Sequence, residues 1–195
     1  MVKSTVSDRP KSKVSKTVCI SLFLSVLVLL TLGLIIWPAV RVVMSLGNRL
    51  ICGTNLVGVG VAVSVYSDDY DGRVPECDNW NDILIAECDV LRKQFQCNYM
   101  KGEGSSYALN ANAAGKELES LPADMVLIYE SVPGWNRCGG SELLNIENHD
   151  GEGCSVLFCS GAVSFVKTEE LDSLVWSEEQ ASEVDAAEDA KVTQE

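Results

Sequence analysis

The sequence predicts an α+β protein in which a long apolar N-terminal helix precedes short helices and an antiparallel sheet. The first observation is an uncharged stretch of 24 residues, Thr17–Val40, rich in Leu, Ile and Val. The second is a series of short apolar segments separated by Gly and Pro, which is typical of strands and turns. The third is a division of charge. Residues 1–51 hold seven Lys and Arg against one acid, net +6, and residues 52–195 hold eight against 27, net −19.

Thr17–Val40 is long enough to cross a membrane, because a helix rises about 1.5 Å per residue and about 20 apolar residues span the hydrocarbon core. Residues 1–16 carry five basic side chains and one acid, and basic flanks stay cytoplasmic. We therefore expect a single-pass inner-membrane protein with a cytoplasmic N-terminus. A cleaved signal peptide is the alternative, but its apolar core is shorter, roughly 7–15 residues, and Trp37–Arg41 offers no small-residue cleavage site.

Residues 41–176 are expected to form one extracytoplasmic domain, followed by a disordered acidic tail at 177–195. The tail has seven acids, one Lys and no aromatic residue after Ser177, so it can bury little. The strongly acidic outer part excludes nucleic acid as a partner, because phosphates require basic surface. The expected partner of residues 17–40 is the lipid bilayer.

Residues 41–70 can be interpreted in two ways. Five valines alternate with small residues, which favours a strand: Val57, Val59, Val61, Val63 and Val65. Other apolar residues follow near-helical spacing: Leu46, Leu50, Val57, Val61 and Val65. The residues themselves leave this choice open. The sequence Asp68–Gly72, followed by Pro75, ends the segment in either case.

The remaining elements are short. Helical segments are expected at Asp78–Cys88 and Glu169–Trp176, the latter with Thr168 as its N-cap, and a helical turn at Lys116–Leu121. Strands are expected at Ser106–Asn110, Met125–Tyr129, Cys154–Phe158 and Ala162–Val166, the last two joined as a hairpin by Ser160 and Gly161.

Seven of the eight cysteines follow the apolar stretch, so at least one is free or pairs with another chain. Cys77, Cys88 and Cys97 flank the Trp80 segment, and we expect two of them to form a disulfide. Cys154 and Cys159 should not pair, because an extended strand points residues five apart to opposite faces.

Two metal sites are conceivable from spacing. Ser67, Asp69, Asp71 and Asp78 fall, with Gly72, on positions of a calcium loop, but Ser replaces the first acid and Asp the last Glu, so affinity would be weak. Cys138, His149, Cys154 and Cys159 supply zinc-type ligands at loose spacing. His149 is the single histidine, and no hydrolase, metalloprotease or nucleotide-binding motif is present, so we expect no catalysis and no required cofactor.

Several segments together resemble bacterial type IV pilin-like and type II secretion pseudopilin-like proteins that carry a C-terminal His-x9-Asp-Gly signature. The similarity covers about residues 40–176 and rests on these residues: Arg49–Leu56, Gly60, Ala62, Tyr66, Asp68–Asp71, Pro75, Trp80, Phe95, Cys97, Ser106–Asn110, Leu127–Ser131, Gly134–Asn136, Gly139, Gly140, His149, Gly151, Val156–Phe158, Gly161 and Val163–Val166. The resemblance implies one continuous N-terminal helix, with 41–69 helical and kinked near Pro38. Its outer half is expected to bury Leu56 and the valines against the sheet.

Two positions depart from that family's pattern. Prepilin-type precursors have Gly before a Phe-Thr-Leu-Ile-Glu start, whereas this chain has Lys16 before Thr17 and Ser21 where the Glu would fall. In the C-terminal signature, His149 and Gly151 are present, but ten residues follow His149 and Ser160–Gly161 replaces Asp-Gly.

The resemblance implies a non-enzymatic, membrane-anchored envelope protein with a structural or assembly role, whose partners are other pilin-like subunits. An anchored binding or sensing module that uses the loop at 132–141 around Trp135 is the alternative. A thiol redox enzyme is a third hypothesis, which the lack of Cys-x-x-Cys disfavours.

Overall fold

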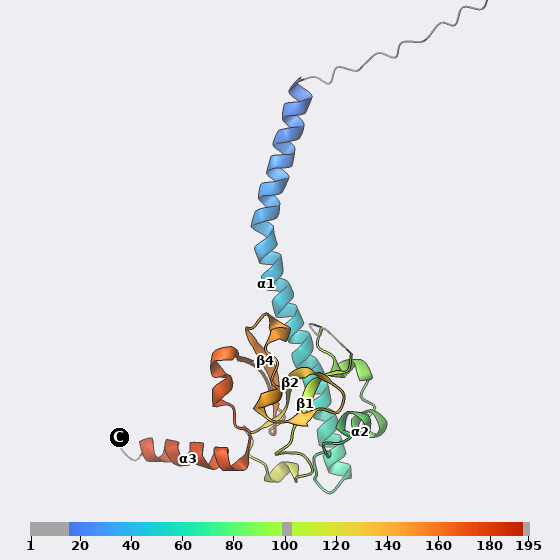
Figure 1. Ribbon diagram of the computed structural model, residues 1–195, viewed down its shortest axis with the longest axis vertical. Helices are drawn as coiled ribbons and strands as arrows, with labels where there is room; N and C mark the ends of the chain where they lie inside the picture. Colours follow the sequence, from blue (N-terminus) through green and yellow to red (C-terminus); the bar gives the residue numbers. More distant parts are fainter. Residues whose placement is uncertain (1–15, 99–102, 193–195) are drawn as a thin grey trace, which may run out of the picture. The chain divides into compact units, whose positions relative to one another are not determined.

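The computed structural model describes residues 16–98 and 103–192 (Figure 1). The chain divides into two units, residues 1–44 and 45–195, which we describe separately. Apart from Lys16, the predicted basic N-terminus at 1–16 lies outside the described residues, as do residues 193–195 of the predicted tail.

Helix α1 spans Lys16–Asp69, which confirms the predicted long helix, and Pro38 lies inside it. Within the first unit its described side chains are exposed and mostly apolar. Two of its hydroxyls bond within the helix, since Ser25 and Thr31 donate hydrogen bonds to the carbonyls of Leu22 and Val28. By length and composition, α1 is the one helix of the described chain that could cross a membrane.

The C-terminal part of α1, in the second unit, packs on the sheet through one face. Leu56, Val59 and Val63 are fully buried, whereas Val57 and Val61 are 49% and 59% exposed. The expectation that all the valines are buried is therefore wrong. In a helix, residues four apart share a face, so Val59 and Val63 point inward while Val57, Val61 and Val65 point outward. The alternating pattern that favoured a strand is divided between two faces of a helix.

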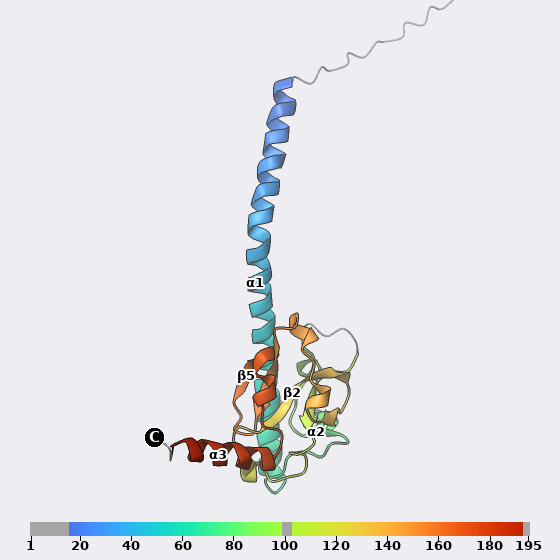
Figure 2. The same ribbon diagram turned by 60° about the vertical axis from the view of Figure 1, so that its left-hand side comes forward.

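A five-stranded sheet with the order β3-β1-β2-β4-β5 forms the centre of the second unit (Figures 1 and 2). Its strands are β1 (Ser105–Asn110), β2 (Val126–Gly134), β3 (Cys138–Gly139), β4 (Gly153–Phe158) and β5 (Val163–Lys167). All neighbours are antiparallel except β1 and β3, which are parallel, so the sheet is mixed rather than purely antiparallel. The two-residue β3 was not predicted, because it is too short to show alternation.

Short helices surround the sheet. They are α2 (Trp80–Glu87) and the 3-10 helices η1 (Arg92–Phe95), η2 (Leu118–Ser120), η3 (Ser141–Leu143), η4 (Glu147–His149) and η5 (Thr168–Ser173). The predicted helix at Glu169–Trp176 is thus a shorter 3-10 helix, and Lys167, not Thr168, is its N-cap. The chain is extended beyond it because the Val175 carbonyl accepts a hydrogen bond from the Val126 N–H, 2.9 Å away.

Helix α3 (Glu178–Val192) occupies most of the segment expected to be disordered (Figures 1 and 2). Its first turn contacts other parts of the second unit. Ala181 is buried in the core, Gln180 Oε1 accepts a hydrogen bond from the Trp176 N–H, and Lys116 pairs with Glu178. Glu178–Val192 is therefore helical rather than disordered as its composition suggested, and these contacts hold its first turn against the domain.

Both faces of the sheet are covered. Tyr107, Leu109 and Ile128 join the cluster that includes Leu56, Val59 and Val63 of α1. Alternate residues such as Ala108 and Tyr129 join a second cluster with Trp176. This alternation follows the two-residue period of a strand and explains why all six residues of β1 are buried.

Candidate functional site

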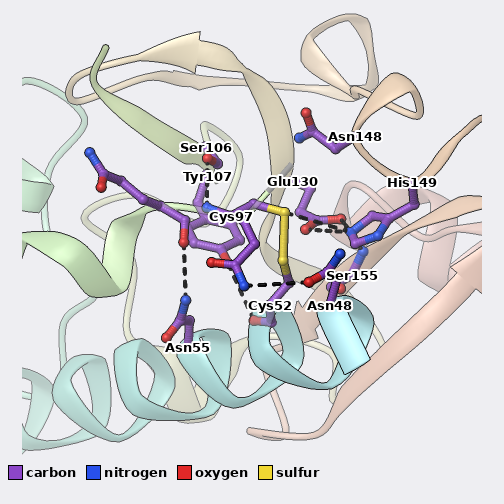
Figure 3. Close-up of a disulfide and its surroundings, with 12 residues drawn as sticks. Asn48, Cys52, Asn55, Cys97, Ser106, Tyr107, Glu130, Asn148, His149 and Ser155 are labelled. Atoms are coloured by element: carbon purple, nitrogen blue, oxygen red, sulfur yellow. Dashed lines mark hydrogen bonds and ion pairs between the residues drawn. A yellow bond between two sulfur atoms is a disulfide. The ribbon is translucent and has the colours of Figure 1, made fainter. Parts of the chain in front are cut away.

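Four buried side chains with reactive or metal-binding atoms meet between α1 and the sheet (Figure 3). Cys52 comes from α1, Cys97 from the segment after η1, Glu130 from β2 and His149 from the end of η4. Their ligand atoms all lie within 4.8 Å of one another, and the four residues are between 0% and 4% exposed. We call this group the Cys–Glu–His cluster.

Cys52 and Cys97 form a disulfide in this structure, with their Cα atoms 5.3 Å apart. His149 Nε2 lies 2.9 Å from Glu130 Oε1 and 3.8 Å from the Cys97 sulfur. The second carboxylate oxygen of Glu130 accepts a hydrogen bond of 2.8 Å from the Ser155 N–H of β4. The last residues at which β2 pairs with β4 are Tyr129 and Val156. The next N–H of β4, that of Ser155, therefore bonds to the Glu130 side chain instead of a backbone carbonyl of β2.

Neighbouring groups hold the cluster in place. The Cys97 N–H donates a 2.8 Å hydrogen bond to Ser106 Oγ, and the Tyr107 hydroxyl donates to the Cys52 carbonyl at 3.3 Å. Burial, and secondarily the charge of Glu130, raise the pKa of Tyr107, so the phenol keeps the proton that it donates. The Phe165 ring packs edge-on against His149, and the Arg49 guanidinium, which also pairs with Glu152, lies over that ring.

The predicted disulfide pairing is wrong, although disulfides are present. Cys97 pairs with Cys52, and Cys77 pairs with Cys138, whose Cα atoms are also 5.3 Å apart. Cys88 remains a thiol, with a pKa raised mainly by burial. Closeness in sequence suggested partners among Cys77, Cys88 and Cys97. The fold instead joins each partner to a residue at least 45 positions away.

Cys154 and Cys159 do not pair with each other, as the strand geometry predicts. Burial raises the pKa of each thiol to about 12, and a nearby carboxylate adds to the effect in both cases. The thiolate is the nucleophilic form, so these two cysteines are poor nucleophiles at neutral pH. They act as small apolar residues in the packing.

The predicted calcium-loop residues are divided between the C-terminal end of α1 and, for Asp78, the turn before α2. Ser67 and Asp69 lie in the last turn of α1, and the Ser67 carbonyl accepts hydrogen bonds from the Tyr70 and Gly72 N–H groups. Asp71 and Gly72 have positive φ, as in a helix C-terminal cap. Within the described chain, Asp69, Asp71 and Asp78 belong to no group of three or more converging His, Cys, Asp or Glu side chains.

The predicted zinc set does not come together either. Cys138 is in a disulfide, and His149 faces Cys97 rather than Cys154 or Cys159. Gly151 and Gly161 of the signature both have positive φ and lie in turns before and after β4. Ser160 shares the second turn with Gly161, so His149 and Ser160 lie at opposite ends of β4.

The loop around Trp135 contacts α2 and η1. The Trp135 indole N–H and the Asn136 amide donate to the two oxygens of Asp82, at 2.8 and 2.6 Å. These hydrogen bonds lower the pKa of Asp82. The Arg92 guanidinium lies 3.8 Å from the Trp135 ring centre. Trp135 and Asn136 thus attach the loop to α2, and Trp135 also contacts η1.

An apolar groove of about 580 Å³ runs along α1 in the second unit. Its walls include one helix face and β5, through Leu46, Leu50, Gly53, Val57, Val163 and Phe165. Sequence reasoning did not identify this groove, because it depends on how β5 packs beside the helix. Comparison of the chain with protein-family models, curated proteins and solved structures gives no match.

Proposed function

We propose that the protein is a pilin-like, membrane-anchored structural or assembly subunit of the cell envelope, with its N-terminus in the cytoplasm and residues 45–195 outside. No catalysis is proposed. The observation that carries the proposal is α1 itself: its N-terminal part is apolar and exposed, and its C-terminal part is in the core of a sheet domain. This arrangement agrees with the resemblance in residues 40–176 to pilin-like and pseudopilin-like proteins.

An exposed apolar stripe on α1 supports contacts between subunits. Leu50, Val57, Val61 and Val65 are 70%, 49%, 59% and 44% exposed. Residues 17–40 already suffice for the hydrocarbon core, and Val61 lies roughly 30 Å further along the helix at 1.5 Å per residue. The stripe therefore extends beyond the lipid, where solvent exposure of apolar surface favours association with another protein surface.

Photo-crosslinking of the full chain in its membrane tests the proposal. A benzophenone amino acid replaces Val61 in one variant and Leu91, an equally exposed residue outside α1, in the control. We expect Val61 to give an adduct of twice the chain mass and Leu91 to give none. An adduct of Val61 with a different protein would favour the anchored binding module, and no adduct from Val61 would contradict the assembly role.

A further inference from the structure

We propose that Cys52, Cys97, Glu130 and His149 form a closed zinc-type metal site when both cysteines are reduced, and that this state and the Cys52–Cys97 disulfide exclude each other. The proposal is independent of the assembly role proposed above. It concerns the Cys–Glu–His cluster, whose four ligand atoms converge within 4.8 Å from four separate segments.

The donor set determines the class of metal. Two thiolates, an imidazole nitrogen and a carboxylate oxygen are ligands that Zn²⁺ binds in tetrahedral sites. Calcium and magnesium are excluded because they require mainly oxygen ligands. All four donors come from the protein and are buried, so no position is left open for water or substrate. The bound metal would thus be structural rather than catalytic.

Supporting hydrogen bonds already orient the donors. Ser155 N–H donates to one oxygen of Glu130, and both oxygens lie 2.9 Å from His149 Nε2. In the disulfide form a proton joins this nitrogen and the carboxylate, and in the metal form the ion takes the place of that proton. Phe165 packs against the His149 ring and limits its rotation. Such outer contacts are what metal ligands need to hold their geometry.

Reduction and oxidation of the Cys52–Cys97 bond convert the disulfide state and the metal-bound state into each other. A dithiol reductant delivers two electrons and two protons to the Cys52–Cys97 bond and is itself oxidised to a disulfide. The two thiols then lose their protons to solvent as the metal binds both sulfurs, and the proton that joined His149 Nε2 and Glu130 leaves that position, either for Nδ1 of the same ring or for solvent. In the reverse step a disulfide oxidant such as oxidised glutathione takes up the two electrons and is reduced to two thiols. The Cys52–Cys97 bond then reforms, so the ion loses two of its four ligands and leaves.

The chain contains its own control in Cys77–Cys138. This pair has the same Cα separation, but both cysteines are only partly buried. Within the described chain it belongs to no group of three or more converging ligands. A metal that acts through the Cys–Glu–His cluster should change the chemistry of Cys52 and Cys97 and leave Cys77 and Cys138 unaffected.

The first experiment uses the full chain in detergent, reduced with a dithiol, freed of the reductant and titrated with Co²⁺ as a spectroscopic substitute for Zn²⁺. We expect thiolate-to-cobalt charge-transfer absorption and tetrahedral visible bands that saturate at one ion per chain. The unreduced protein should show neither. Absence of these bands from the reduced wild-type chain would overturn the proposal without reliance on any variant.

The second experiment measures disulfide formation in the reduced chain after addition of oxidised glutathione, by trapping thiols and mapping peptides. At free Zn²⁺ about ten times its dissociation constant, about one site in ten is metal-free, so formation of Cys52–Cys97 should slow about tenfold. Formation of Cys77–Cys138 should keep its rate. Equal slowing of both pairs, or of neither, would contradict a metal site at the cluster.

Variants assign the ligands. His149→Ala should weaken Co²⁺ binding by more than the roughly 10- to 100-fold that loss of an outer contact costs. Cys154→Ala, which removes a buried thiol outside the cluster, should leave Co²⁺ affinity unchanged. Retention of wild-type affinity in His149→Ala, or its loss in Cys154→Ala, would show that the metal binds elsewhere.

Discussion

Glu130 is a carboxylate without exposed surface, and its oxygens are engaged by the Ser155 N–H and by His149. Glu130→Ala leaves the buried donors at this carboxylate without an acceptor, so we expect it to destabilise the oxidised protein by about 1–3 kcal/mol for each donor. Glu130→Gln keeps one acceptor oxygen and should cost about 1–2 kcal/mol. Chemical denaturation of the full chain in detergent measures both. The exposed Glu119→Ala is the control, and a Glu130→Ala effect as small as that of Glu119→Ala would contradict this role.

Protonation of Asp82 should lower the free energy of unfolding at acid pH. Hydrogen bonds from Asn136 and Trp135 lower its pKa below the ordinary value of 3.8, so the stability that they add is full above that pH and is lost as the pH falls through the lowered pKa. Asp82→Ala should therefore be less stable than wild type at pH 6, and the difference should shrink below pH ~3.8. Thermal unfolding at a series of pH values measures it. A pH-independent difference would rule out this linkage.

The candidate site was harder to predict from sequence than the elements that carry it. His149 was identified as the single histidine, and Cys97 as one of the cysteines near Trp80. Glu130 was missed, although a lone acid that follows the apolar run Met125–Tyr129 was a usable signal. The pairing of Cys52 with Cys97 depends on how α1 meets the sheet, which spacing along the chain does not specify.

At the level of elements, the helical face of α1 gives a matched pair of substitutions. Val63 is fully buried and Val61 is 59% exposed, yet both are valines in the same helix. Val63→Ala removes two buried methyl groups and should destabilise the second unit by about 2 kcal/mol. Val61→Ala should change stability by less than about 0.5 kcal/mol. Equal effects in denaturant titration would contradict the packing described for α1.

Element positions could be predicted largely from local pattern. The strands at 106–110, 154–158 and 162–166 were found because apolar segments alternate with turn residues such as Ser160 and Gly161. The spacing of apolar residues could not decide whether 41–69 is a helix or a strand, because Val57–Val65 satisfy both the strand and the helix period. Close packing resolves it: a Cβ on Gly60 would lie 3.0 Å from the Leu157 side chain, so glycine lets the helix approach the sheet.

At the scale of the whole molecule, four of the eight cysteines should be in disulfides and four should be thiols. Two disulfides leave four thiols: Cys19, Cys88, Cys154 and Cys159. Thiol titration of the unfolded, unreduced chain should therefore count four. In the folded chain Cys154 should react slowly at pH 7, because burial raises its pKa to about 12. A count of eight would contradict both disulfides, and a count of six would leave one of them unformed.

The charge of the chain is also unevenly distributed along its length. Residues 1–16 carry a net +4 and residues 41–195 a net −17, so the two flanks of the apolar stretch Thr17–Val40 have opposite charge. Basic residues before the span favour a cytoplasmic N-terminus. The charge division supports the proposed cytoplasmic N-terminus. Retention of residues 17–40 as an anchor is a separate expectation, which the measurement below tests.

The retention of the N-terminus tests the central claim, a permanently anchored pilin-like subunit, most directly. The measurement is mass spectrometry of N-terminal peptides from the protein in membranes and medium of its own host. We expect membrane-bound protein in which Lys16 and Thr17 are still joined. A mature chain that begins at Thr17, or protein released into the medium without residues 17–40, would contradict it.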